Sequence, residues 1–229
     1  MKKRILVISL GGSLIIPDNV DINFLRKFRK IIRKHTNKYK FVIVCGGGSI
    51  ARKYIKALKE EGKSTYLQCL AGISATRMNA RFMSYFFNQD PDKGIPHDMK
   101  EVQGLLRKNN IIFCGALRYS KNETSDGTAA KLARFLKSEF INLTNVPGLH
   151  DKNPKKFRNA KFIPKISWLK FWEMASKIKY QAGQHFVLDQ NAAKVIQAGK
   201  IRTYILGEDM KNLDKFLSGK KFKGSIISD

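Results

Sequence analysis

The stretch that most constrains this chain is 41–55, where an apolar run rich in β-branched residues breaks into three glycines and continues with helical spacing. Gly46, Gly47 and Gly48 let the backbone approach a ligand closely and adopt a positive φ. The helix that follows begins with amide groups that have no partner inside the helix, and these favour an anion. A similar turn, Leu10-Gly11-Gly12-Ser13, follows the first apolar run. Two such turns predict phosphate groups bound side by side.

The remaining chain alternates between strand and helix patterns. Strands are predicted at 4–10, 40–45, 110–115, 140–144 and 201–206, with a final edge strand at 224–227. Helices are predicted after Asp21 and at 49–61, 64–87 (punctuated by Gly72), 98–107, from 125, 167–180, 189–198 and 210–217. This alternation predicts an α/β fold with an open, mostly parallel sheet, helices on both faces and ligands beyond the carboxyl ends of the strands. No linker or repeat divides the chain, so residues 1–229 are expected to form a single domain.

The charge balance is strongly basic, with 44 Lys and Arg against 18 Asp and Glu and a net charge of +26. Such a field attracts nucleotides and RNA. The basic residues are spread over the whole chain, however, so a solvated surface is favoured over a nucleic-acid face. Cys45, Cys69 and Cys114 read as thiols in a reducing compartment. His35 and His97 are expected at the surface, and no metal-ligand spacing occurs. No signal peptide or membrane span is indicated, which predicts a cytoplasmic protein.

Neither glycine turn matches a Walker A or a GxGxxG pattern. Arg52 lies one turn into its helix, where it is either placed to contact a phosphate in bidentate fashion or is an ordinary surface arginine. Thr124-Ser125-Asp126 opens a helix, as an N-cap, as an anion or base site, or as both. Thr144 and Asn145 end a strand where a nucleotide could rest.

These motifs occur in a specific order: LGGS (10–13), CGGGSIARKYI (45–55), GISATRMNA (72–80), TSDGTAAKLARFL (124–136), LTNVPGLHDKNPKK (143–156) and AGQHFVLDQNAAKVI (182–196). The ordered set resembles the amino acid kinase superfamily, and within it the archaeal-type uridylate (UMP) kinases, over residues 5 to 227. The resemblance implies a three-layer αβα sandwich that assembles as a homo-oligomer, often a hexamer. It also implies that the N-terminal half binds the phosphoryl acceptor and the C-terminal half binds ATP with Mg²⁺.

Site residues follow from the resemblance position by position. It implies that ATP is bound by Gly12, Ser13, Gly48, Arg52, Thr144, Asn145, His150 and Asn153. It implies that the acceptor is bound by Gly47, Cys69, Thr124, Ser125 and Asp126, with catalytic roles for Arg52 and Ser13. The nucleophile would be an oxygen of the acceptor phosphate, which is already anionic. Catalysis would then rest on positioning and on charge neutralisation by Mg²⁺, backbone amides and Arg52.

The chain departs from these relatives around the acceptor. Relatives carry a carboxylate that grips the ribose hydroxyls where this chain has Cys69, and a Gly-Thr-His-Pro-Gly-His stretch where it has the longer, basic loop 116–123. Ser9 replaces a lysine found in some members of the superfamily. The preferred function is ATP-dependent phosphorylation of UMP to UDP. Two alternatives remain open: a kinase of the same fold for another small phosphate or carboxylate, and a catalytically weakened nucleotide-binding or regulatory protein whose basic surface holds RNA.

Overall fold

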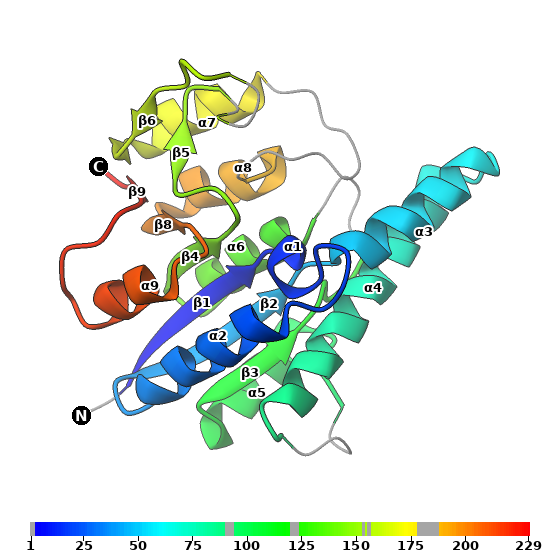
Figure 1. The fold of residues 1–229 in the computed structure, drawn as a ribbon, viewed down its shortest axis with the longest axis horizontal. Helices are drawn as coiled ribbons and strands as arrows, with labels where there is room; N and C mark the ends of the chain where they lie inside the picture. The colour runs from blue at the N-terminus through cyan, green and yellow to red at the C-terminus, as the bar shows by residue number, and fades with distance from the viewer. Residues whose placement is uncertain (1–2, 90–93, 120–123, 153, 155–156, 178–187) are drawn as a thin grey trace.

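The computed structural model describes residues 3–89, 94–119, 124–152, 154, 157–177 and 188–229. A seven-stranded sheet in the order β3-β2-β1-β4-β8-β9-β7 runs through its centre (Figure 1). Its strands are β1 (Arg4–Leu10), β2 (Tyr39–Cys45), β3 (Ile111–Cys114), β4 (Glu139–Leu143), β7 (Lys165–Ile166), β8 (Thr203–Leu206) and β9 (Ser225–Ile227). A separate antiparallel pair is formed by β5 (Leu149–His150) and β6 (Phe162–Ile163) within the turn-rich segment 145–165.

The strand register aligns the carboxyl ends of the central strands at one edge of the sheet. Leu10 at the end of β1 pairs with Cys45 at the end of β2 and with Leu143 at the end of β4, and both pairings are parallel. The mostly parallel sheet is therefore confirmed, with β8 and β9 as its antiparallel pair among the described strands. The prediction that 224–227 forms an edge strand is wrong. β9 lies between β8 and β7, because the two-residue strand Lys165–Ile166 pairs with its outer side.

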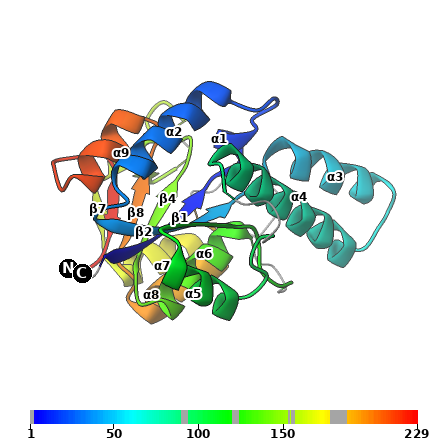
Figure 2. The ribbon, with the colours of Figure 1, turned by 90° about the horizontal axis from the view of Figure 1, so that it is seen from below.

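Helices cover both faces of the sheet, which confirms the three-layer αβα arrangement (Figure 2). One face packs α2 (Ile22–Lys34), α4 (Thr65–Phe86) and α9 (Met210–Leu217) against alternate strand residues such as Leu6 and Ile8. The intervening Val7 faces α5 (Met99–Lys108), α6 (Ser125–Phe135), α7 (Trp168–Ser176) and α8 (Gln190–Gly199). The two remaining helices, α1 (Gly12–Ile15) and α3 (Gly48–Glu60), begin at the glycine turns.

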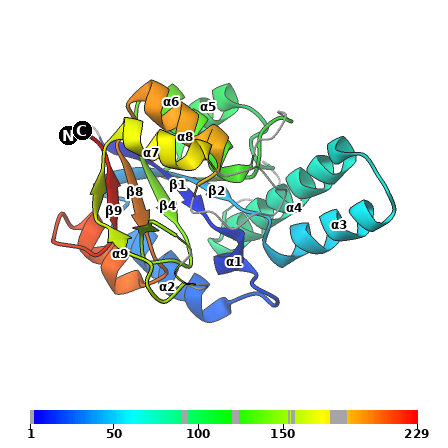
Figure 3. The same ribbon diagram turned by 90° about the horizontal axis from the view of Figure 1, so that it is seen from above.

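Helices α3 and α4 form an antiparallel pair that projects from the body of the molecule, beside the edge of the sheet where the carboxyl ends of the central strands align (Figure 3). Gly72 does not interrupt α4. A Cβ there would lie 3.3 Å from Ile55 Cδ1, so the glycine permits close packing of α4 on α3. The helix predicted at 167–180 is described as Trp168–Ser176, and its predicted end lies outside the described residues.

His35 corrects a second expectation, since it is buried at 7% exposure instead of lying on the surface. It caps the C-terminal end of α2 where that helix meets α9. Its Nε2 lies 2.7 Å from a carboxylate oxygen of Asp214 on α9, which also accepts hydrogen bonds from Lys34. These hydrogen bonds hold the pKa of Asp214 below its ordinary value. The acidic partner, 179 residues away in the chain, makes burial of the imidazole tolerable.

Candidate active site

The two glycine turns touch each other backbone to backbone. A Cβ added to Gly12 would lie 2.7 Å from both the Gly46 carbonyl carbon and the Gly48 Cα, and a Cβ on Gly46 would lie 3.1 Å from the Gly12 Cα. No side chain fits at either position without moving main-chain atoms. Gly48 is also the residue of this pair of turns with a positive φ, +63°, which other residues adopt at a cost. The two turns are therefore side by side, as the sequence predicts.

Hydrogen bonds hold the turns to the ends of β1 and β4 and to the end of α1. The Gly11 amide donates to the Leu143 carbonyl at 2.9 Å, and the Gly46 amide donates to the Leu10 carbonyl at 2.9 Å. The Ser49 amide donates to the Ile16 carbonyl at 3.0 Å, which ties the first turn of α3 to the end of α1. The beginnings of the two helices thus form one rigid unit, and two groups bound on them would keep a fixed separation.

Arg52 lies in α3 one turn beyond Gly48. One of its guanidinium nitrogens donates to the Pro17 carbonyl at 3.1 Å. This contact holds the half-buried side chain against the segment that follows α1. A guanidinium has five N–H groups in a planar fork, so the bond to Pro17 leaves donors for a phosphate. Arg52 is placed beside both turns, while its predicted contact with phosphate stays a prediction.

Two carboxylates, Asp126 and Asp189, lie close to each other near the carboxyl end of β1. Asp126 is in the first turn of α6 and accepts a hydrogen bond of 2.5 Å from the Ser9 hydroxyl of β1. Asp189 caps α8, where it accepts from the Ala192 amide at 2.8 Å and from the hydroxyl of Thr124. Thr124 in turn caps α6 by accepting from the Asp126 amide at 3.1 Å. A helix begins at Ser125 as predicted, but its cap is Thr124, whereas Asp126 lies in the first turn and is not the cap. Thr124 links the N-termini of α6 and α8 through an acidic cluster formed by Asp126 and Asp189.

The acidic cluster changes the protonation of Asp126. Protein atoms crowd its carboxyl group although the residue as a whole is half-buried. This burial, together with the neighbouring charge of Asp189, raises the pKa of Asp126 to about 7, against the opposing effect of the Ser9 hydroxyl. The group is therefore close to half protonated at neutral pH, with its proton lost when the local charge becomes more positive.

The donor set fits a magnesium ion that is bound mainly through phosphates. Mg²⁺ commonly takes one or two protein carboxylates and completes its shell with water and substrate phosphates. Asp126, which accepts from Ser9 near the end of β1, and the neighbouring Asp189 supply two such carboxylates. No cluster of three or more His, Cys, Asp or Glu side chains that could hold a metal occurs among the described residues.

Helix α4 organises the side of the site where the acceptor is predicted to bind. The Thr76 hydroxyl accepts from the Ala116 amide at 2.9 Å, and Arg77 Nε donates to the Ala116 carbonyl at 3.0 Å. The Arg77 guanidinium also donates to the Leu117 carbonyl, and Asn79 Nδ2 donates to the Gly46 carbonyl at 2.7 Å. Thus α4 holds both the glycine turn and the segment after β3.

None of these three side chains was predicted as a site residue. They lie within the motif at 72–80, so a signal was present, but each contacts a backbone group that the motif alone does not reveal. Ser9 and Asp189 were not predicted as site residues either, because their side-chain partners come from distant segments. Cys69, which is predicted as a site residue, lies on α4 about two turns before Thr76. Partial burial raises the pKa of its thiol, so the group is neutral at pH 7.

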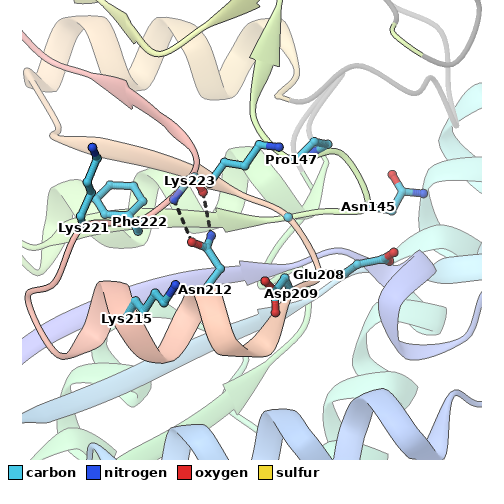
Figure 4. A pocket seen from close by; sticks show the side chains of 10 residues that line it. Asn145, Pro147, Glu208, Asp209, Asn212, Lys215, Lys221, Phe222 and Lys223 are labelled. Atoms are coloured by element: carbon cyan, nitrogen blue, oxygen red, sulfur yellow. Dashed lines mark hydrogen bonds between the residues drawn. The ribbon is translucent and has the colours of Figure 1, made fainter.

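On the side where ATP is predicted to bind, the structure places Thr144 beside the first turn. Its amide donates to the Leu206 carbonyl at 3.0 Å, and a Cβ on Gly11 would lie 3.8 Å from its Cα. Asn145 lines a hollow of about 670 Å³ between the ends of β4 and β8 and helix α9 (Figure 4). Two hydrogen bonds, of 2.7 and 2.8 Å, join the Asn212 side chain to the backbone of Lys223 and fix the far wall of this hollow.

The other predicted ATP residues are less clearly grouped. His150 lies in β5, where its ring meets that of Phe162 at 5.5 Å and its Nδ1 is 3.2 Å from the Gly148 carbonyl. It is not among the residues that line the hollow at Asn145. Asn153 lies outside the described residues. The structure thus brings Gly12, Gly48, Arg52, Asp126 and Thr144 to one edge of the sheet.

Comparison with known proteins identifies the class to which this fold and this edge belong. The model of the amino acid kinase family matches residues 4–207, so the chain belongs to that family. Within it, the chain is 33% identical to the uridylate kinase of Thermococcus onnurineus, over 97% of this chain and 98% of that protein. The crystal structure of uridylate kinase from Archaeoglobus fulgidus matches with a TM-score of 0.83 at 33% identity, covering 97% of this chain and 99% of the other. The UMP kinase of Ureaplasma parvum, at 23% identity and a TM-score of 0.78, shares the fold.

Proposed function

We propose that this protein transfers the terminal phosphoryl group of ATP to UMP and so forms UDP. The observation that carries the proposal is the backbone contact between the turns at Gly12 and at Gly46–Gly48, which would hold two phosphates at a fixed separation. Uridylate kinases that match over nearly the whole chain support this choice of acceptor. We treat residues 1–229 as one domain, with an acceptor-binding N-terminal half and an ATP-binding C-terminal half.

In this proposal the acceptor phosphate lies on Gly47 and Gly48, and Arg52 neutralises the charge between the two phosphates. The segment 124–126 borders the acceptor through its hydroxyl groups and Asp126. The attacking oxygen belongs to a phosphate that is already anionic, so no general base is needed. Catalysis consists of positioning and of electrostatic stabilisation by preorganised donors.

On the donor side, Gly12 and Ser13 approach the ATP phosphates, and Thr144 and Asn145 contact the nucleotide. Asp126 and Asp189 would hold Mg²⁺ together with the phosphates. The bound ion would neutralise charge on the phosphoryl group as it is transferred. Without a bound ion, protonation of Asp126 limits its repulsion with the neighbouring Asp189.

The test is phosphoryl transfer from ATP and Mg²⁺ by the purified protein across UMP, CMP, AMP, GMP and a set of small phosphates and carboxylates. Selective turnover of UMP supports the proposal. Turnover of another acceptor keeps the transfer mechanism and reassigns the pocket around Cys69. Comparison with Cys69→Asp sharpens the result, because a carboxylate there would restore a ribose-binding group and raise kcat/KM for UMP.

The rival is a nucleotide-binding or regulatory protein that holds RNA through its charge of +26. It predicts ATP binding without turnover, together with RNA affinity that falls steeply as salt rises. A filter-binding titration between 50 and 200 mM salt, run alongside the transfer assay, separates the two functions. A flat salt dependence with UMP turnover excludes the rival.

We also propose, from the resemblance, that the chain forms a homo-oligomer, with a hexamer as the expected state, and that it works in the cytoplasm. Light scattering on the purified protein measures the first directly, and a monomer would contradict it. Among the described residues, no helix is both long and apolar enough to cross a membrane.

A further inference from the structure

Two exposed tyrosines contact each other on the side of the site where we propose that the acceptor binds. Tyr66 lies in the first turn of α4, and Tyr119 lies in the segment between β3 and α6. Their ring centroids are 4.8 Å apart and the planes are nearly perpendicular, at 85°. The side chains nevertheless remain 50% and 41% exposed. An edge-to-face pair leaves ring faces open, so this pair still has apolar surface to offer.

The position of the pair follows from the face of α4 on which it lies. Tyr66, Cys69, Ile73 and Arg77 recur every three or four residues and therefore line one face of the helix. That face contacts the segment after β3 at two places, through Tyr66 near the N-terminus of α4 and through Arg77 further along the helix. Cys69 lies between these two places.

The end of this face near Arg77 adjoins the turn at Gly46–Gly48. A Cβ on Gly47 would lie 3.6 Å from the Thr76 Cγ2 atom, in the same helical turn as Arg77. Tyr66 is roughly 15 Å further along the helix axis, at 1.5 Å per residue. A ligand whose phosphate occupies the glycine turn must therefore be elongated to approach the tyrosines. A nucleoside monophosphate, together with the reach of the tyrosine side chains, can bridge this separation, and a compact phosphate or carboxylate cannot.

We propose that Tyr66 and Tyr119 form an aromatic wall that binds the base of a nucleoside monophosphate acceptor. This inference rests on the proposed function and narrows its acceptor class. This face of α4 carries Cys69 where a carboxylate would bind ribose hydroxyls, and a thiol is only a weak hydrogen-bond donor. Stacking of a base on aromatic rings supplies affinity by a different route. The base, not the sugar, then contributes most of the binding beyond the phosphate.

The experiment measures binding by calorimetry for UMP, ribose 5-phosphate and inorganic phosphate. The variants are Tyr119→Leu, which keeps apolar bulk without a ring, and Tyr119→Phe, which keeps the ring. Tyr66→Leu tests the second ring. Tyr85→Leu is the matched control, because Tyr85 is also an exposed tyrosine of α4, at 45%, near its opposite end. Circular dichroism verifies that each variant is folded.

We expect the two leucine variants at positions 119 and 66 to weaken UMP binding about tenfold, the scale of one base–aromatic stack. Their affinity for ribose 5-phosphate and inorganic phosphate should change less than twofold, and Tyr119→Phe and Tyr85→Leu should match the wild type. If the tyrosines only fixed the segment after β3, UMP and ribose 5-phosphate would weaken equally, and that result would overturn the proposal. Unchanged UMP binding in both leucine variants would also overturn it.

Failure of the proposed function gives a different result. If the wild type binds no nucleoside monophosphate, both the function and the aromatic wall are wrong. If the wild type binds and phosphorylates UMP while the leucine variants keep full affinity, the function stands and only the wall is wrong.

Discussion

Replacing Asp126 by asparagine should stabilise the folded chain, and the gain should grow with pH. In the wild type, burial and the charge of Asp189 raise the pKa of Asp126 from 3.8 to about 7. The folded state therefore holds this proton more tightly than the unfolded state does. As pH rises between about 4 and 7, the unfolded chain ionises first, and the wild type loses stability. Asparagine can still accept the hydrogen bond from Ser9, but it carries no charge to be buried.

The magnitude follows from the size of the pKa difference. One pKa unit corresponds to about 1.36 kcal/mol, so the full difference is worth about 4 kcal/mol once both states are ionised. At pH 5 the unfolded state is already largely ionised while the folded state is not, which gives about 1.7 kcal/mol. The advantage of the variant should therefore widen by about 2.5 kcal/mol between pH 5 and pH 8.

The assay is urea unfolding of both proteins at pH 5 and at pH 8, monitored by circular dichroism. Asp21→Asn is the control, because Asp21 caps α2 as an exposed carboxylate and asparagine caps a helix equally well. Comparing variant with wild type at each pH cancels the titration of all other groups. A gap in unfolding free energy that stays constant or narrows between the two pH values would refute the electrostatic reasoning.

Three further substitutions test the geometry of the site. Gly12→Ala should lower the unfolding free energy by about 3 kcal/mol because its Cβ overlaps the backbone of Gly46 and Gly48. Gly104→Ala, in open space on α5, should raise it by up to about 1 kcal/mol in the same denaturation assay. Equal effects of the two substitutions would contradict the contact between the turns. Arg77→Ala should lower stability by about 2 to 3 kcal/mol, since two carbonyls lose a charged donor, and thermal unfolding identical to that of the wild type would count against this role. Arg52→Ala should reduce kcat at least tenfold, the effect of one charged phosphate contact of roughly 1.5–3 kcal/mol, and unchanged steady-state kinetics would remove Arg52 from the site.

Much of the fold is encoded in signals that are local. The buried run at 41–44, the glycines on its carboxyl side and the caps at Asp21, Thr124 and Asp189 each identify an element from a few neighbouring residues. Parallel pairing then follows from the alternation of strands and helices. This is why the sandwich and the position of the site edge are predictable.

What local signals miss is set by pairing between distant segments. The two-residue strand at Lys165–Ile166 has no apolar pattern of its own and exists because β9 pairs with it. His35 reads as a surface residue until Asp214 is placed beside it. Ser9 and Asp126 likewise become partners only when β1 lies against α6, so the raised pKa has no signature in either segment.

The contact between the two glycine turns has a consequence for how this protein can change over time. The atoms that would hold the two phosphates apart belong to the main chain, and every substitution elsewhere leaves them in place. Side chains that we propose to lie around the acceptor, such as Cys69 and Tyr119, could therefore be exchanged without changing the separation of the two turns. A new acceptor would need new side chains around it, while the spacing of the two turns is set by main-chain contacts at Gly12, Gly46 and Gly48.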